Sequence, residues 1–248
     1  MRAAGIDIGS RTVKFVVMEN REIVHEAIAY NSHDPISVAR SLLQECPFDR
    51  LTATGYGRHL ISRTLGCEVA TEIRAAAIGT AVMVPTGRTI IDIGGQDIKV
   101  ISTGENGEVR RFEMNDKCAA GTGRFLEIMA AALSLSMSEF IQLAQTAVQP
   151  VRITSMCTVF AESEVVSQLA RGCARDELAL GIHHAIAQRI AGMAQRTSLT
   201  ETIVVCGGVA RNATLIRELT RVLGLPVVTP DRAQLIPAIG AAMLSHPE

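Results

Sequence analysis

The sequence predicts an α/β protein with two domains, and two observations indicate this fold class. A unit of two apolar strands joined by an Asp-x-Gly turn occurs twice, at residues 5–17 and 90–101. After the second copy, segments with helical periodicity alternate with short apolar runs, an alternation typical of α/β proteins. The chain has 248 residues, 48% of them hydrophobic, which is enough for one large or two modest cores.

Both copies of the repeated unit predict a β-hairpin. In the first, β-branched residues lead into Asp7-Ile8-Gly9 and resume at Thr12; in the second, they lead into Asp92-Ile93-Gly94 and resume at Ile98. An apolar run that stops at a glycine-centred turn and then continues is expected to fold back on itself as two antiparallel strands.

The other elements follow from periodicity and from helix start and stop signals. We expect helices at residues 121–133, 157–172, 175–196, 212–223 and 236–244, a helix begun by the capping box Ser136-x-x-Glu139, and one opened by Glu72 between the hairpins. Strands are expected at residues 203–206 and 227–228, with a turn at Gly207-Gly208. Domain I would comprise residues 1–86 plus 234–248, and domain II residues 87–233.

The hairpin turns carry the groups that a phosphate site needs. Glycine lets backbone N–H groups approach phosphate oxygens, and a neighbouring carboxylate can hold magnesium through water. Asp7 and Asp92 are the candidate magnesium carboxylates, and Asp92 is also a candidate catalytic group. The candidate phosphate contacts are Gly9, Ser10, Arg11, Thr12 and Lys14 from the first hairpin, and Gly94, Gly95 and Gln96 from the second.

One Asp-x-Gly alone is as often a simple turn, but two copies favour a nucleotide site. A third element, running from Val205 through Gly207 and Gly208 to Asn212, suits close packing against adenosine. No Walker-type loop is present in the sequence. In this order the three elements resemble the superfamily of acetate and sugar kinases, heat-shock chaperones and actin. The resemblance implies an actin-like ATPase (ribonuclease H-like) fold, with two α/β domains around a cleft that binds ATP or ADP with Mg²⁺.

Two of the six cysteines precede predicted helix starts. Backbone amides and the helix dipole stabilise a thiolate there, which favours Cys118 and Cys157 as metal ligands, although simple core packing is the alternative. A four-iron cluster takes four thiolates, so two per chain would require a twofold dimer. The remaining cysteines, expected to be structural in a reducing compartment, are Cys46, Cys67, Cys173 and Cys206.

The segments around these cysteines, at residues 114–127 and 155–164, resemble the activator family of 2-hydroxyacyl-CoA dehydratases and the ATPase subunits of benzoyl-CoA reductase. The resemblance extends over nearly the whole chain, including residues 54–58 and 71–73. It implies one 4Fe-4S cluster held by Cys118 and Cys157 of two subunits, either a homodimer or a pair of related chains, in an anaerobic host. ATP hydrolysis would drive a low-potential electron from a donor such as ferredoxin or flavodoxin to an iron–sulfur dehydratase or reductase.

Two departures from the family pattern concern single positions. Arg11 stands where many relatives have threonine, and Ala76 where histidine is frequent. Neither removes a motif.

Several polar residues keep two interpretations. Glu72 is the best candidate for orienting the attacking water, and a helix-start carboxylate is the alternative. Glu162 and Glu164 either contact the nucleotide or cap their own helix. His183 and His184 point about 100° apart on a helix, so they are expected at the surface or in packing rather than on a shared metal.

The overall composition excludes some classes of function. Lysine and arginine number 24 against 25 acidic residues, so the formal charge of −1 gives no field favouring nucleic acid or a membrane surface. No apolar stretch reaches the roughly 20 residues of a membrane span and no signal peptide is seen, so a cytoplasmic protein is expected. The alternatives are a small-molecule kinase of the same fold, which predicts a colourless protein, and an actin-like scaffold, which predicts nucleotide-dependent polymerisation.

Overall fold

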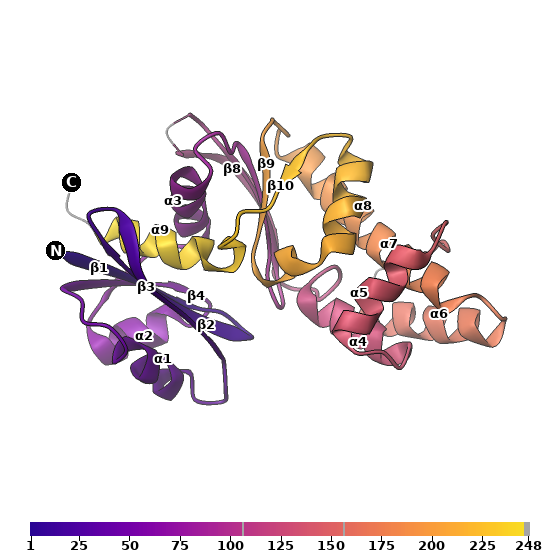
Figure 1. The fold of residues 1–248 in the computed structure, drawn as a ribbon, viewed down its shortest axis with the longest axis horizontal. Helices are drawn as coiled ribbons and strands as arrows, with labels where there is room; N and C mark the ends of the chain where they lie inside the picture. Colours follow the sequence, from indigo (N-terminus) through magenta and orange to yellow (C-terminus); the bar gives the residue numbers. More distant parts are fainter. Residues whose placement is uncertain (106, 156, 246–248) are drawn as a thin grey trace.

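The computed structural model describes residues 1–105, 107–155 and 157–245 and shows two five-stranded sheets in separate lobes (Figure 1). The sheet orders are β3-β2-β1-β4-β5 and β10-β9-β6-β7-β8. In the first lobe β1 pairs antiparallel with β2 and parallel with β4, and in the second β6 pairs antiparallel with β7 and parallel with β9. The duplication predicted from the two Asp-x-Gly turns is therefore a duplication of sheet topology.

The first sheet has a helical layer on each face. Phe15 and Val17 of strand β2 lie on one face of the sheet, where they pack with Leu42 and Ile61. Val16 and Met18 lie on the other face, because successive side chains of a strand point to opposite faces. The elements of this lobe are β1 (Arg2–Ile8), β2 (Thr12–Glu19), β3 (Glu22–Tyr30), α1 (Pro35–Leu43), β4 (Arg50–Gly55), α2 (Arg58–Leu65) and β5 (Glu68–Val69).

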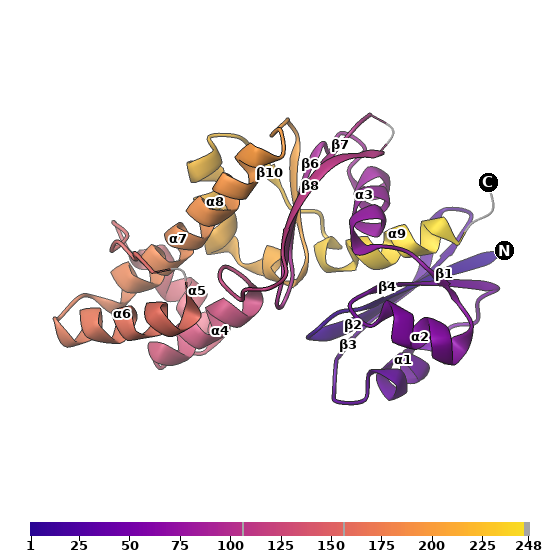
Figure 2. The same cartoon turned by 180° about the vertical axis from the view of Figure 1, so that it is seen from behind.

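Two helices stand between the sheets, α3 (Glu72–Met83) and α9 (Ile236–Leu244), and their backbones touch (Figure 2). A Cβ at Gly79 would overlap the Ile236 carbonyl, and one at Gly240 would overlap the Ala75 carbonyl. Helix α9 also packs on β2 of the first sheet. The C-terminal helix thus returns to the first lobe. The exact domain limits stay a prediction, and residues 246–248 of domain I lie outside the described residues.

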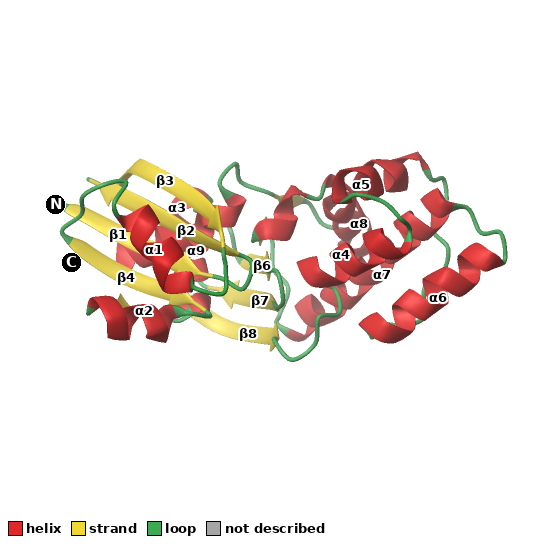
Figure 3. Ribbon diagram, turned by 90° about the horizontal axis from the view of Figure 1, so that it is seen from below, coloured by secondary structure: helices red, strands yellow, loops and turns green. Residues whose placement is uncertain are grey.

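The second lobe joins its sheet to a helical region, which Figure 3 places at the end of the molecule away from the first sheet. Its core surrounds α7, in which residues such as Leu178, Ile182 and Ile186 are fully buried. The elements are β6 (Thr89–Ile93), β7 (Ile98–Thr103), β8 (Val109–Asn115), α4 (Gly123–Ala132), α5 (Met137–Thr146), α6 (Thr158–Ala170), α7 (Arg175–Arg196), β9 (Ile203–Cys206), α8 (Ala213–Leu223) and β10 (Val227–Val228).

The expected helices are present, with small shifts at their starts. The capping box of Ser136 and Glu139 is confirmed at α5. Cys157 and Asn212, expected as first residues of helices, are N-caps instead. The turn expected at Gly207-Gly208 continues into a short 3-10 helix, Gly208–Arg211. Within the described residues no single helix is long and apolar enough to cross a bilayer; α4 and α5 reach that length only as a pair bent by 78°.

Candidate functional site

The turns of the two hairpins meet between the lobes. A Cβ at Gly95 would overlap Cγ of Arg11 and would lie 3.0 Å from Oγ of Ser10, so glycine alone leaves room for this approach. Asp7 and Asp92 sit at the ends of β1 and β6, each 5% exposed. Burial raises the pKa of Asp92, and the charge of Asp7 adds to that rise. Both predicted magnesium carboxylates therefore belong to one electrostatic site.

Each hairpin is built in the same way around its turn. Gly9 N–H donates to the Thr12 carbonyl at 3.0 Å, and Gly94 N–H donates to the Asp97 carbonyl at 2.9 Å. The exposed tips carry Ser10 in the first turn and Gln96 in the second. The amides of Gly9 and Gly94 are therefore used inside the hairpins, which leaves the amides at the tips of the turns for phosphate oxygens, and the phosphate contacts of both turns stay a prediction.

A lysine lies opposite each aspartate on the neighbouring strand. Lys14 Nζ lies 2.8 Å from Asp7 Oδ2, and Lys99 Nζ lies 3.5 Å from Asp92 Oδ2. The strand register pairs Asp7 with Lys14 and Asp92 with Lys99 directly. Each lobe therefore supplies one carboxylate that is paired with one ammonium group of the neighbouring strand.

A glycine with positive φ flanks each aspartate from the parallel strand. Gly55 has φ +87° and Gly207 has φ +86°. A Cβ at Gly207 would lie 2.6 Å from Asp92 Oδ1, and one at Gly55 would overlap Asp7 Oδ1. Both positions need glycine for conformation and for space, so the carboxylates keep an open side.

Lys99 is the centre of a buried charge cluster. Its Nζ lies 2.7 Å from Glu72 Oε2 and 2.7 Å from Asp97 Oδ2, in addition to Asp92. Burial alone would lower the pKa of Lys99, but the three carboxylates raise it above its usual value. Burial in turn raises the pKa of Glu72, whose Oε1 lies 3.6 Å from Arg58 Nη1. Lys99, Asp97 and Arg58 were not among the predicted site residues, although the repeated Asp-to-Lys spacing could have indicated Lys99.

The second turn is bonded directly to the start of α4. Gly123 N–H donates to the Gly94 carbonyl at 3.0 Å, and Arg124 N–H donates to the Gly95 carbonyl at 2.9 Å. In addition, Arg11 Nη2 lies 2.6 Å from Glu127 Oε1 on α4. The guanidinium predicted to contact phosphate is thus paired with a carboxylate, and its role toward phosphate stays a prediction.

Cys118 and Cys157 are both exposed, but only Cys157 lies at a helix start, whereas Cys118 lies in the loop between β8 and α4, whose N-cap is Thr122. Asn115 Nδ2 donates to the Cys118 carbonyl at 2.9 Å, and Cys157 is the N-cap of α6. Among the residues that the structure describes, no group of three or more His, Cys, Asp or Glu side chains is placed to hold a metal ion. Two exposed thiols near helix N-termini fit a cluster completed by another chain.

The glutamates near Cys157 and the four remaining cysteines are also located by the structure. Glu164 accepts hydrogen bonds from the backbone of Thr154 and Ser155, so it fixes the segment before Cys157. Glu162 is exposed on α6. Cys206 is fully buried beside Asp92, and burial raises the pKa of its thiol well above the usual value, whereas Cys46, Cys67 and Cys173 are partly buried.

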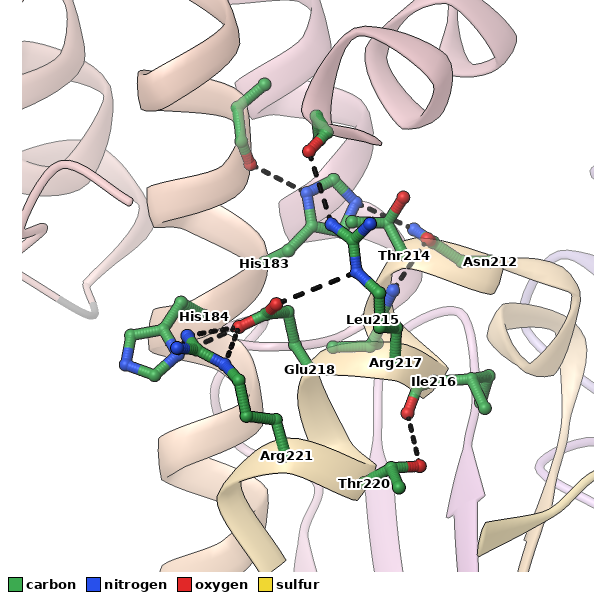
Figure 4. A network of polar contacts seen from close by, with 12 residues as sticks. His183, His184, Asn212, Thr214, Leu215, Ile216, Arg217, Glu218, Thr220 and Arg221 are labelled. Carbon is green, nitrogen blue, oxygen red and sulfur yellow. Dashed lines mark hydrogen bonds and ion pairs between the residues drawn. The ribbon is translucent and has the colours of Figure 1, made fainter. Parts of the chain in front are cut away.

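Asn212 joins the adenosine-type turn to α7 (Figure 4). Its Oδ1 accepts from Leu215 N–H at 3.0 Å, and its Nδ2 donates to His183 Nε2 at 3.0 Å. The other ring nitrogen of His183, Nδ1, then donates to the Ala179 carbonyl at 2.7 Å. Since both ends of the Asn212 amide are used, its contact with adenosine stays a prediction. His184 instead contacts Glu218, at 3.0 Å, so the two histidines share no site.

The chain is similar to known sequences over almost its full length. The family model described as the BadF/BadG/BcrA/BcrD ATPase family matches residues 4–245. The chain is 40% identical to the activator of lactoyl-CoA dehydratase of Anaerotignum propionicum, over 99% of this chain and 98% of that protein. It is 30% identical to a benzoyl-CoA reductase subunit of Thauera aromatica, over 87% of this chain and 81% of that protein.

Solved structures agree as well. Component A of the (R)-2-hydroxyglutaryl-CoA dehydratase of Acidaminococcus fermentans superposes with a TM-score of 0.92 at 37% identity, covering 99% of this chain and 97% of that one. The activator of the 2-hydroxyisocaproyl-CoA dehydratase of Clostridium difficile, with bound ADPNP, gives 0.90 at 37% identity, with coverages of 99% and 94%.

The fold itself is shared more widely. A ROK family glucokinase of Streptomyces griseus gives a TM-score of 0.62 at 14% identity, covering 99% of both chains, which shows a shared fold alone. The actin-like α/β fold and the resemblance to the activator family, both predicted from the sequence, are confirmed. The chain belongs to the BadF/BadG/BcrA/BcrD ATPase family.

Proposed function

We propose that this protein is an ATP-hydrolysing activator that, as a dimer sharing one 4Fe-4S cluster, passes a low-potential electron to a 2-hydroxyacyl-CoA dehydratase or a related CoA-ester reductase. The observation that carries the proposal is the pair of hydrogen bonds from the first turn of α4 to Gly94 and Gly95. Helix α4 directly follows the Cys118 loop, so the phosphate turn and the thiol loop form one bonded unit.

In the nucleotide site each group has a defined task. The amides at the tips of the turns that begin at Gly9 and Gly94 would bind phosphate oxygens, and Asp7 and Asp92 would hold Mg²⁺. Glu72 orients the attacking water, because its burial raises the carboxyl pKa and makes it a better base than an exposed glutamate. Lys99 keeps Glu72 and Asp92 in place through its ion pairs with both carboxylates.

At the cluster, Cys118 and Cys157 supply two thiolates and a second copy supplies the other two. The cluster provides a carrier for one electron. Cys157 is the N-cap of α6, and Cys118 lies in the loop that α4 follows. A change in closure of the hairpin turns around the nucleotide would therefore move α4, and with it the Cys118 loop, through the bonds of α4 to Gly94 and Gly95. A protein donor such as ferredoxin or flavodoxin would then supply the next electron to the cluster.

The proposal predicts a division of labour between two variants. Asp92→Ala should abolish ATP hydrolysis and keep the iron, whereas Cys118→Ala should lose the iron and keep ADP binding, with Cys46→Ala as a control that keeps both. Iron content, ADP affinity and phosphate release are measured on oxygen-free protein reconstituted with iron and sulfide. Loss of ADP binding in Cys118→Ala, or phosphate transfer to a sugar hydroxyl by iron-free protein, would contradict it.

A further inference from the structure

A groove of about 1010 Å³ crosses the second lobe and has no role in the function proposed above. One wall is the end of β8 at Glu113 to Asn115, the other is the segment 150–154, and the floor is α7 from Gly181 to Arg196. None of the residues of the two Asp-x-Gly turns lines it. Gly181 brings the second wall close to the floor, because a Cβ there would overlap the Val151 carbonyl.

Each wall of the groove lies just before one of the two candidate cluster cysteines in the sequence. Asn115 lies three residues before Cys118 and donates to its carbonyl, and Thr154 lies three residues before Cys157 and is held by Glu164. An occupant that touches both walls therefore contacts the supports of both sulfur loops. This position suits a partner whose docking must be close to the thiols.

The charge of the groove is positive. Among its described lining residues are three arginines, Arg152, Arg189 and Arg196, and one carboxylate, Glu113, which forms a two-pronged ion pair with Arg196. The chain as a whole has a formal charge of −1, so the excess is local to this groove. A protein surface of one sign attracts a partner of the opposite sign and steers its approach.

Two of the three guanidiniums have donors to offer. Nε of Arg189 is buried without a hydrogen-bond partner among the described residues, and the Arg189 stem packs beside Gly121 of the Cys118 loop. Arg152 is exposed and forms no ion pair with a described carboxylate. A carboxylate from outside the chain would therefore give the guanidinium groups of Arg152 and Arg189 an ion-pair partner that the described residues do not supply.

The length of the groove decides what kind of acceptor fits. From Gly181 to Arg196 the helix rises about 22 Å, the length of an extended peptide of roughly six or seven residues. A single small anion would contact only one part of this length. Guanidinium groups bind carboxylates through paired N–H donors, so acidic side chains match the lining.

We propose that this groove binds an extended acidic segment of the protein to which this chain passes an electron. The identity of that partner rests on the proposed function, but the binding of acidic peptide does not. Docking there places the partner against Asn115 and Thr154, beside both cysteine loops.

The test uses the full chain, free of iron and nucleotide, and fluorescein-labelled hepta-glutamate as the probe. Fluorescence anisotropy at about 20 mM salt should show binding that Arg152→Glu weakens at least about tenfold. Arg63→Glu on α2 is the matched control, an exposed arginine of the first lobe whose reversal changes net charge equally. Arg189→Met, which removes the charge but keeps an apolar stem, should also weaken peptide binding. In the wild-type protein, addition of the peptide should slow backbone amide exchange at residues 113–115 and 150–154.

Three results would overturn the proposal. Equal peptide affinity of the Arg152→Glu and Arg63→Glu proteins would show that net charge alone attracts the probe. Equally tight binding of hepta-lysine would exclude charge recognition. Binding of inorganic phosphate that slows exchange in the groove, with no binding of hepta-glutamate, would make it a small-anion site. Because the sample holds no iron or nucleotide, these outcomes are independent of the ATPase and iron tests of the proposed function.

Discussion

Arg11 Nη2 lies 2.6 Å from Glu127 Oε1 and so joins the first hairpin turn to α4, across the boundary between the lobes. Residues 116 positions apart in the sequence thus connect the phosphate-type turn of one lobe to the helix that follows the Cys118 loop of the other. Both side chains are partly exposed, at 51% and 33%, so the pair adds little to stability and more to the relative placement of the two parts.

Arg11→Thr and Glu127→Gln should each change the free energy of unfolding by less than about 1 kcal/mol, because the pair is exposed. Each should, however, shrink the effect of ADP on the alkylation rate of Cys118 in iron-free protein, followed by peptide mass spectrometry. In the wild type that effect is expected to be at least about fivefold. Arg2→Thr, which removes the Arg2–Glu19 pair within the first lobe, is the control. An unchanged ADP effect in both variants would contradict the link.

Lys99→Met should destabilise the protein by about 3–5 kcal/mol, because it leaves the carboxylates of Glu72, Asp92 and Asp97 without their shared cation. Lys14→Met should cost less, since Lys14 has a single carboxylate partner, Asp7. Urea unfolding measures both. Adding Glu72→Gln to Lys99→Met should recover part of the loss, and an unfolding midpoint for Lys99→Met equal to that of the wild type would refute the cluster.

Gly207→Ala should lower ADP affinity by at least about tenfold, because the new Cβ would lie 2.6 Å from Asp92 Oδ1 and displace it. The new Cβ would also overlap the Ile93 carbonyl, and at φ +86° and ψ 178° the backbone of Gly207 lies in a region essentially restricted to glycine, which adds about 1–3 kcal/mol. Gly66→Ala is the control for a positive φ without crowding: φ there is +70°, in the left-handed region, and nothing lies within 4 Å of the new Cβ. Calorimetric titration with ADP should separate them, and equal affinities would exclude crowding at Asp92.

His183 should make stability pH-dependent. Burial lowers its pKa from 6.5 to about 4, so between these values the unfolded chain binds a proton that the folded chain does not. Stability is then fully present above pH 6.5 and falls as the pH drops toward 4, by about 3 kcal/mol in total. His183→Gln, whose amide can still accept from Asn212 and donate to Ala179, should fold and lose this part of the slope in urea titrations. An unchanged slope would contradict the assignment.

The sequence predicted the hairpins and most helices because local signals determine them. The Asp-x-Gly turns and the capping box at Ser136 are such signals, and each is present in the structure. Four strands, β3, β4, β5 and β8, were not predicted, and neither were helices α1 and α2. In β3 apolar residues such as Val24 and Ile28 lie on the exposed side, which hides the alternation. Strand β8 is mostly exposed and forms through its pairing with β7, so its own sequence carries little signal.

Only those parts of the candidate site that carry a local sequence motif could be predicted. The motif carboxylates Asp7 and Asp92 lie close enough for the charge of Asp7 to raise the pKa of Asp92, and their binding of magnesium stays a prediction. The partners of Lys99 and the bonds from α4 to Gly94 and Gly95 arise from packing between distant segments, which no local pattern reveals. The groove over α7 likewise depends on three separate segments meeting.

The most direct test measures molar mass and iron in one oxygen-free sample after reconstitution, by light scattering and elemental analysis. A dimer with about four irons and four sulfides is expected, and either Cys118→Ala or Cys157→Ala should remove the iron, since these are the two exposed cysteines of the described residues. A monomer that hydrolyses ATP yet binds no iron would contradict the sharing of one cluster between two chains, and with it the electron-transfer role.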